Sequence, residues 1–301
     1  MLRKKQGRVR WPQCLFSFGI GLFMTSVSTT AAAFQPPVHP SRRATLQTLA
    51  AVLLVPAFSP AHAQLAVSTA INRTARFRAL SQRIAKSYCQ LHLRTLPVQA
   101  QNTLNTARQL VGVGFADLAK VLWPAELAQQ VADLRKHSDV LESLLVMPPT
   151  RESVAAVATQ SDRMLAASQL ATQAFEKFAK AGTARLVNTA GLQRALSQRL
   201  AKNYFLLAAN LEGKNTREEM KSDSTEFRQA LAQLAAAPIS TPAIRNELAL
   251  GEAQWVFFDA ALQRKADERG LETVGTTSER LLEVMDRLTG LYDTALKEVL
   301  G

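Results

Sequence analysis

The sequence contains few of the cysteine and histidine residues that many catalytic and metal sites use. Only two cysteines and four histidines occur among its 301 residues. Beyond residue 63 there are only Cys89, His92 and His137, so no internal disulfide can form in that part of the chain. Cys89 and His92 stand three residues apart on one predicted helix, but no further metal ligands accompany them. No nucleophile–base arrangement or glycine-rich phosphate loop is present. The sequence therefore predicts no enzyme, no metal site and no cofactor.

Long apolar runs are confined to the first 63 residues. Leu46 to Phe58 is apolar, the basic Ser41-Arg42-Arg43 precedes it, and the small residues of Ala61-His62-Ala63 follow it. That order is typical of a secretory signal. The arginine pair resembles a twin-arginine export signal, although the usual aromatic residue is missing, so ordinary secretion stays open. We expect residues 1–63 to be a leader cleaved after Ala63, which would deliver the protein to the periplasm.

An earlier apolar patch, Leu15 to Met24, is about ten residues long and too short to cross a bilayer, which needs about 20. Translation from Met1 and from Met24 are both open interpretations of this patch. After residue 63 every long segment is interrupted by charges, so we expect no membrane span in the mature chain.

The net charge of +12 is concentrated in the leader. Residues 1–63 hold seven basic and no acidic residues, which leaves 29 basic and 24 acidic residues, a net charge of +5, for residues 64–301. This mild balance does not indicate nucleic-acid binding, which is typically accompanied by basic residues clustered on one face.

Aromatic residues make up only 6% of the chain, and alternating β-branched runs are missing. Residues 64–301 are instead rich in helix-forming Ala, Leu, Gln, Glu, Lys and Arg. Prolines and glycines divide them into segments that predict eight helices. The predicted helices span about 65–95, 98–122, 124–146, 151–180, 183–211, 216–237, 241–267 and 274–300. We expect an all-α protein of two tandem four-helix bundles, residues 64–180 and 181–301, that form a pseudo-dimer.

A sequence repeat supports that division. Asn72 to Lys86 recurs 116 residues later as Asn188 to Lys202, and the core Arg-Ala-Leu-Ser-Gln-Arg is identical in both copies. Residues 161–165 and 278–282 correspond in the same way in the predicted fourth helices. Chance does not readily give six identical residues in register, so the chain is interpreted as two copies of one unit. The repeated element contains arginine, serine and glutamine and no paired carboxylates, which favours binding over catalysis.

Two stripes of alternating three- and four-residue spacing run along the first repeated helix. The apolar stripe, predicted to be the bundle core, comprises Val67, Ala70, Thr74, Phe77, Ser81, Ile84, Tyr88 and Leu91. The second stripe comprises Ile71, Ala75, Arg78, Gln82, Ala85 and Cys89, with counterparts Val187, Gly191, Arg194, Gln198, Ala201 and Phe205.

The second stripe is interpreted as half of an anion site that is present twice. Its small residues, Ala75 and Gly191, allow two helices to approach closely, which would bring Arg78 and Arg194 to one point. Two arginines in a tight interface repel each other unless an anion lies between them, and a guanidinium suits a planar oxyanion. The opposing interpretation is an ordinary solvated basic face. Arg83, Arg199, Lys86 and Lys202 lie off this stripe and are expected in solvent or in surface salt bridges.

The second copy resembles the signature helix of the PilJ/NarX-like sensor domain, the N-terminal domain of type IV pilus methyl-accepting chemotaxis transducers and of nitrate/nitrite sensor kinases. The matching residues are Asn188, Ala190, Gly191, Arg194, Ser197 and Arg199. The first copy departs from this pattern at Thr74 and Ala75, where the family usually has Ala-Gly.

The resemblance implies a periplasmic four-helix bundle that binds its anion across a dimer interface, with one arginine from each half. Arg78 and Arg194 take those positions here, which implies an intramolecular pseudo-dimer that binds nitrate or nitrite. Gln82 and Gln198 would donate supporting hydrogen bonds. No signalling segment follows the last predicted helix, so we expect a detached sensor module whose partner is a membrane receptor or sensor kinase. The ligand and the partner stay open, as does pairing within one chain or between chains.

The alternative is a ligand-free interaction module that docks to a membrane chemoreceptor, a sensor kinase or a pilus component. It predicts arginines that lie far apart in solvent, together with a broad exposed apolar face. The apolar cluster at residues 255–258 is expected in the core, with such a docking surface as its other interpretation. A third possibility, a purely structural helical repeat, predicts two bundles without a mutual interface.

Overall fold

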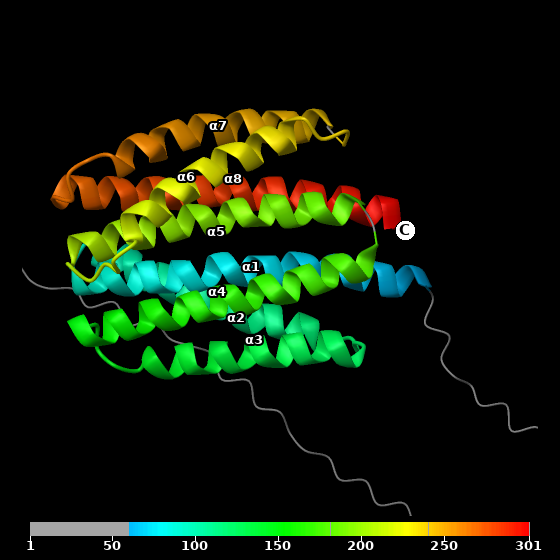
Figure 1. Cartoon of the computed structure of the whole chain (residues 1–301), viewed down its shortest axis with the longest axis horizontal. Coiled ribbons are helices and arrows are strands. Elements are labelled where there is room, and N and C mark those ends of the chain that lie inside the picture. Colours follow the sequence, from blue (N-terminus) through cyan, green and yellow to red (C-terminus); the bar gives the residue numbers. More distant parts are fainter. Residues whose placement is uncertain (1–59, 181, 240, 301) are drawn as a thin grey trace, which may run out of the picture. The chain divides into compact units, whose positions relative to one another are not determined.

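A computed structural model describes residues 60–180, 182–239 and 241–300, and in these residues the chain forms eight α-helices and no strand (Figure 1). The helices are α1 (Pro60–His92), α2 (Pro97–Leu118), α3 (Ala125–Leu144), α4 (Arg151–Ala179), α5 (Gly182–Ala208), α6 (Thr216–Ala235), α7 (Pro242–Leu262) and α8 (Glu268–Leu300). The all-α prediction is confirmed. The predicted leader lies outside the described residues, except that residues 60–63 belong to α1.

The helices form two four-helix bundles (Figure 1). In the first, α1 packs against α2 and α4, and α3 packs against α4. In the second, α5 packs against α6 and α8, and α7 packs against α8 and α6. The two bundles meet mainly where α1 packs along α5. The first helix of each bundle, α1 or α5, thus has neighbouring helices from both bundles around it.

Threonine residues cap the starts of α4 and α7. Thr150 caps α4, where its hydroxyl accepts from the Ser153 amide and the Ser153 hydroxyl accepts in return from the Thr150 amide. Thr241 caps α7 through one bond, in which its hydroxyl accepts from the Ile244 amide, and Pro242 lies in the first turn. These local signals explain why most predicted helix boundaries agree with the structure to within a few residues.

The predicted start of the last helix is wrong. Gly270 was expected to precede a helix beginning near residue 274, but α8 begins at Glu268. The amide of Gly270 donates to the Asp267 carboxylate at 2.9 Å, which caps the helix. A Cβ on Gly270 would lie 2.0 Å from the carbonyl oxygen of Lys265, so this glycine permits a close backbone approach inside the first turn.

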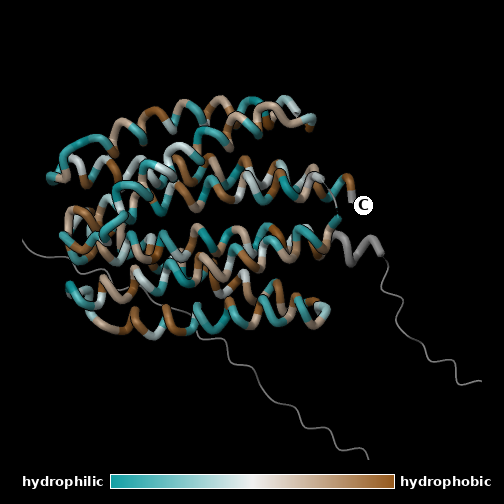
Figure 2. Tube along the Cα trace, viewed as in Figure 1, coloured by the Kyte–Doolittle hydropathy of each residue, from teal (hydrophilic) through white to brown (hydrophobic). Residues whose placement is uncertain are grey.

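Both predicted stripes of α1 are buried, apart from Leu91, which is half-buried. The apolar stripe packs inside the first bundle, where Phe77 stacks on Phe115 with ring centroids 4.5 Å apart. Figure 2 shows hydrophilic and hydrophobic residues interspersed along the helices, the two central ones included. A central helix with polar residues on a buried side must pair those residues with partners from its neighbours.

None of the helices in the described residues is long and apolar enough to cross a membrane.

The closest approach of α1 and α5 has room for only one methyl group. A Cβ on Gly191 would lie 2.8 Å from the Cβ of Ala75. We therefore expect Gly191→Ala to lower the free energy of unfolding by about 1–3 kcal/mol through overpacking, despite the higher helix propensity of alanine, which is worth about 1 kcal/mol. Urea unfolding followed by circular dichroism measures this change.

Gly290→Ala is the matched control, because a Cβ on this glycine of α8 has no atom within 4 Å and should stabilise the protein by about 0.5–1 kcal/mol. The double variant Ala75→Gly/Gly191→Ala moves the methyl group to the other helix and should recover most of the loss. Equal stability of the Gly191→Ala and Gly290→Ala proteins would show that α1 and α5 are not in this tight contact.

Candidate functional site: the buried interface between the two bundles

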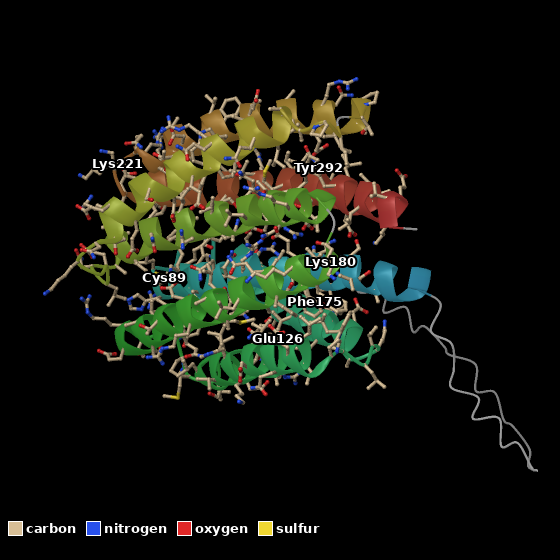
Figure 3. The ribbon with its side chains drawn as sticks, turned by 45° about the vertical axis from the view of Figure 1, so that its right-hand side comes forward. Cys89, Glu126, Phe175, Lys180, Lys221 and Tyr292 are labelled. Atoms are coloured by element: carbon tan, nitrogen blue, oxygen red, sulfur yellow. The ribbon has the colours of Figure 1, made fainter. Side chains whose placement is uncertain are left out.

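Helices α1 and α5 run in the same direction through the interface. Ala75 meets Gly191, and further along both helices the Lys86 ammonium donates to Gln198 Oε1 at 2.8 Å. Because both residue numbers increase together, the helices are parallel, as their colours also show in Figure 1. Figure 3 shows nitrogen and oxygen atoms gathered between these ribbons, with Phe175 in the first bundle and Tyr292 in the second.

Arg78 and Arg194 lie together at this crossing. Their side chains are 1% and 2% exposed. Their Nη2 atoms lie 3.2 Å and 3.4 Å from the point that a Cβ on Gly191 would occupy. The two nitrogens are therefore at most about 6.6 Å apart. The two arginines that the repeat singled out do come to one point, and the missing side chain of Gly191 leaves the room for them.

The Arg78 guanidinium has only neutral partners. It donates to the carbonyl oxygens of Ala75 at 3.3 Å and Asn188 at 3.1 Å, and to the side-chain oxygen of Gln169. Among the described residues no carboxylate lies within 4.0 Å of it. Burial, together with the positive charge of Arg194, lowers the pKa of Arg78 to about 9. Arg78 is thus a buried cation without a contacting counter-ion.

Arg194 differs from Arg78 because it has a carboxylate partner. Its Nη1 donates to Asp286 at 2.7 Å and its Nη2 to the Asn72 side-chain oxygen at 3.1 Å. Its Nε is buried and has no partner among the described residues. Asp286 also accepts from Arg76 at 2.5 Å. Burial lowers the pKa of Arg194, and the charge of Asp286 opposes this effect.

A cavity of about 410 Å³ opens beside Arg194. Its lining comes from α1, α2, α5 and α8 and includes Arg76, Arg83, Arg194, Glu279 and Asp286, whereas Arg78 lies outside that lining. The cavity therefore adjoins Arg194 and Asp286, while Arg78 lies behind them in the interface.

The glutamines of the second stripe lie one turn further on and contact neither arginine. Gln82 donates to the Ser161 carbonyl oxygen at 3.1 Å, and Gln198 donates to the Ser278 carbonyl oxygen at 2.9 Å. Each bond joins the first and fourth helices of one bundle. Gln198 Oε1 accepts from Lys86, while Gln82 Oε1 is buried without a partner among the described residues. In this structure the glutamines hold the bundles together and do not support the arginines.

The expectation that Lys86 and Lys202 lie in solvent or at the surface is wrong. Their side chains are 0% and 2% exposed. Lys86 pairs with Glu279 at 2.5 Å, and Lys202 pairs with Asp162 at 2.5 Å. Each pair joins the first helix of one bundle to the fourth helix of the other, so the two pairs are reciprocal. The spacing of apolar residues predicted only two buried stripes on each of these helices. Because α1 and α5 are buried on further sides as well, the burial of Lys86 and Lys202 was not predicted.

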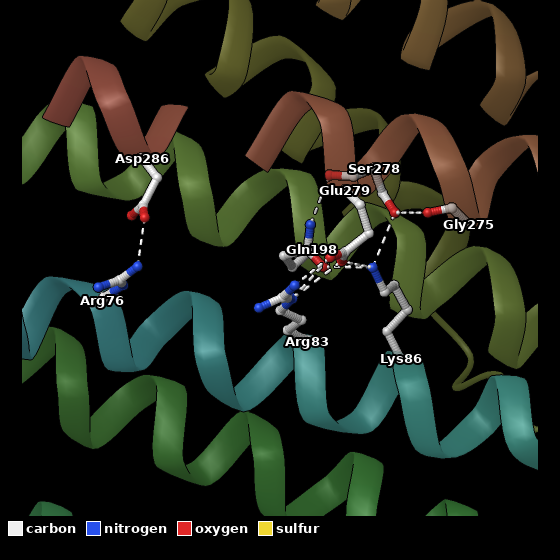
Figure 4. A network of polar contacts seen from close by, with 8 residues as sticks. All are labelled: Arg76, Arg83, Lys86, Gln198, Gly275, Ser278, Glu279 and Asp286. Atoms are coloured by element: carbon white, nitrogen blue, oxygen red, sulfur yellow. Dashed lines mark hydrogen bonds and ion pairs between the residues drawn. The ribbon is translucent and has the colours of Figure 1, made fainter. Parts of the chain in front are cut away.

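The network around Lys86 is shown in Figure 4. The Lys86 ammonium also donates to the Ser278 hydroxyl at 3.0 Å, and Arg83 forms an ion pair with the same Glu279. Burial raises the pKa of Glu279, but the charges and hydrogen bonds of Lys86 and Arg83 outweigh it and hold this pKa at about 2. Arg199, the counterpart of Arg83, pairs instead with Asp223 on α6 of its own bundle.

A second reciprocal pair lies at the other side of the arginines. Asn72 donates to Asp293 at 3.2 Å, and Asn188 donates to Glu176 at 2.5 Å, each across the interface. Both asparagines begin the repeated segment, so the repeat marked them, but nothing in the sequence indicated which acids they contact.

Cys89 and His92 take structural positions. Cys89 is buried, and burial raises the pKa of its thiol to about 12. His92 Nδ1 lies 2.9 Å from the carbonyl oxygen of Pro149. Within the part of the chain that the structure describes, no group of three or more His, Cys, Asp or Glu side chains is placed to hold a metal ion.

The site is thus formed by two parallel first helices that bury their cations between two helical bundles. In a comparison with protein families, the PilJ family, described as the N-terminal domain of type IV pili methyl-accepting chemotaxis transducers, matches residues 178–262. This match covers α5, α6 and α7, including Arg194 and Gln198. The segment that is similar to the PilJ family therefore lies in the second bundle. Neither the curated proteins nor the solved structures include a match.

Acid should weaken the interface through Glu279. Its pKa is about 2 in the folded protein against an ordinary 4.5, so its stabilising contribution is fully present above pH 4.5 and is lost as the pH falls toward 2. A difference of this size corresponds to about 3 kcal/mol. We expect the free energy of unfolding, measured by urea titration at several pH values, to fall in that window.

Glu279→Gln should lower stability at neutral pH, because it leaves Lys86 buried without its carboxylate, and should make the pH dependence shallower. Glu272→Gln, which changes an exposed glutamate on the same helix, should keep the full dependence. A Glu279→Gln protein with an unchanged slope between pH 5 and pH 3 would contradict the role given to this pair.

Proposed function

We propose that the chain is a periplasmic sensory module that binds a small oxyanion, nitrate or nitrite by resemblance, between Arg78 and Arg194. The observation that carries this proposal is the pair of buried guanidinium groups, whose nearest nitrogens are at most about 6.6 Å apart and of which only one contacts a carboxylate. An isolated buried charge is unfavourable unless it is paired. An anion placed between the two groups would supply the counter-ion that Arg78 lacks.

The geometry suits a small planar anion. Each guanidinium presents several N–H donors in one plane, which matches the oxygens of a planar oxyanion. The Arg194 Nε is buried without a partner, so this side retains an unused donor. The absent side chain at Gly191 lets the Nη2 atoms of both arginines approach the same point of the interface.

We further propose that residues 64–180 and 181–301 are two copies of one unit that pair within the chain. The supporting observation is that equivalent residues make equivalent contacts. Lys86 and Lys202 are 116 residues apart, and the acids that they bond, Glu279 and Asp162, are 117 residues apart. Asn72 and Asn188 are likewise 116 residues apart, and the acids that they bond, Asp293 and Glu176, are 117 residues apart. A repeat of this kind would give an intramolecular counterpart of a two-chain sensor.

The alternative interaction module predicts solvated arginines far apart, whereas here they are buried and adjacent. In the cluster at residues 255–258, Trp255 and Phe258 are in the core, while Val256 and Phe257 are 64% and 63% exposed on α7. Two exposed residues do not make a broad apolar face. In this proposal the module binds its ligand first, and the ligand-bound module then signals by docking to a chemoreceptor, sensor kinase or pilus component.

Thermal unfolding with nitrate, nitrite, sulfate or chloride at equal ionic strength tests the anion site. A ligand that binds only the folded state raises stability by about 2.7 kcal/mol at a hundredfold excess over Kd. We expect a selective rise with nitrate or nitrite. Arg78→Met should abolish that rise without lowering the stability of the anion-free protein, because it replaces an uncompensated buried charge with an apolar group of similar length.

Arg163→Met is the matched control, since it removes one positive charge from an exposed position on α4 and should keep the anion response. The same stabilisation by all four anions, or an unchanged response in Arg78→Met, would rule out the proposed site. The interaction module would then be the better description.

A further inference from the structure

The two halves of the arginine site differ in one acceptor. Arg78 donates to Gln169 on α4, and Arg194 donates to Asp286 on α8. These acceptors occupy equivalent positions, because each lies eight residues after the serine, Ser161 or Ser278, whose carbonyl oxygen bonds the stripe glutamine. One half therefore has a neutral amide where the other half has a carboxylate.

Asp286 is an anion bound to the site within the chain. Its two oxygens contact Arg194 at 2.7 Å and Arg76 at 2.5 Å. Burial raises the pKa of Asp286, but the charges of Arg194 and Arg76 outweigh burial and hold that pKa below its ordinary value. The carboxylate is consequently ionised at neutral pH and occupies donors that a bound oxyanion would use.

Asp286 also stands at the entrance to the site. It lines the cavity of about 410 Å³ together with Arg76 and Arg194, and its side chain is 32% exposed. The Arg194 side chain behind it is 2% exposed. A solute that enters through this cavity meets Asp286 before it can contact both arginines.

We propose that Asp286 is a built-in competitor that closes the arginine site in the anion-free protein. It must release Arg194 before a solute anion can bridge Arg194 and Arg78. Arg76 is half-buried on α1 and can retain the displaced carboxylate, because it already holds the second oxygen. This inference rests on the proposed anion site and adds its regulation.

Competition of this kind has two consequences. The apparent affinity is lower than that of the open site by the fraction of molecules in which Arg194 is free. Anion binding is also coupled to α8, because the displaced side chain belongs to that helix and not to the arginine helices. The exchange thereby gives the second bundle two arrangements that a ligand can select.

Reciprocal substitutions test the competitor in the full-length chain. Asp286→Asn gives Arg194 an amide partner like the one Arg78 already has, and Gln169→Glu gives Arg78 a carboxylate like the one Arg194 has. A charge-assisted hydrogen bond is strong enough for a tenfold to hundredfold effect. Isothermal titration with sodium nitrate should therefore show Asp286→Asn binding about ten to a hundred times more tightly than the unmodified chain.

Gln169→Glu should bind nitrate correspondingly more weakly. Asp139→Asn, which removes a carboxylate that is 61% exposed on α3, controls for net charge and should leave the affinity unchanged. Circular dichroism establishes that each variant is folded, and Gln169→Glu carries the test alone if Asp286→Asn does not fold.

Equal or weaker nitrate binding by folded Asp286→Asn overturns the competitor while leaving the anion site in place. Nitrate binding by Gln169→Glu that is as tight as that of the unmodified chain, or tighter, likewise overturns the competitor and leaves the anion site in place. A different outcome, in which neither the unmodified chain nor any variant binds nitrate, overturns the proposed site itself and the competitor with it.

Discussion

The close contact of Ala75 with Gly191 is the constraint on which the rest of the interface depends. Because α1 and α5 approach so closely, the long cationic side chains on their facing sides cannot reach solvent past the partner helix. Arg78, Arg194 and Lys86 are consequently buried, although a buried charge is costly unless it is paired. The pairing groups must then come from the next helices outward, which are α4 and α8.

This requirement explains why the fourth helices carry polar residues on the side that faces the other bundle. Asp162 and Glu279 reach across to the lysines of the opposite bundle, and Glu176 and Asp293 reach across to the asparagines. Buried ion pairs are weak contributors to net stability, but they penalise arrangements in which they are broken. We infer that their main effect is to fix the register of one bundle against the other, because a shift of either central helix would separate two reciprocal pairs at once.

The fold was largely predictable because its signals are local. Capping residues, prolines and apolar spacing act within a few residues, and they located all eight helices. The meeting of Arg78 and Arg194 was also predictable, since the small residues one turn earlier occur in both copies. Lys86 and Lys202 were misplaced because spacing alone does not say how many neighbours a helix has. Asp286 was missed for a different reason: its contact with Arg194 spans 92 residues, and its counterpart in the other copy is Gln169, so the repeat did not mark it.

Two identical chains could not carry that difference between Asp286 and Gln169, whereas two bundles joined in one chain can. Two copies of the first bundle would place Arg76 and Arg78 twice around the centre, which gives four cations and no carboxylate. Two copies of the second bundle would place Arg194 and Asp286 twice, with Leu192 at the position of Arg76, and the charges would cancel. At these four positions and the position of Gln169, the joined chain has three cations and one carboxylate, an intermediate balance that no pair of identical chains can reach. A centre with four cations would be costly without an anion, and a neutral one would have little reason to take an anion up. In the function proposed above, the mixed centre would fold without an anion and would still retain a net positive charge to attract one.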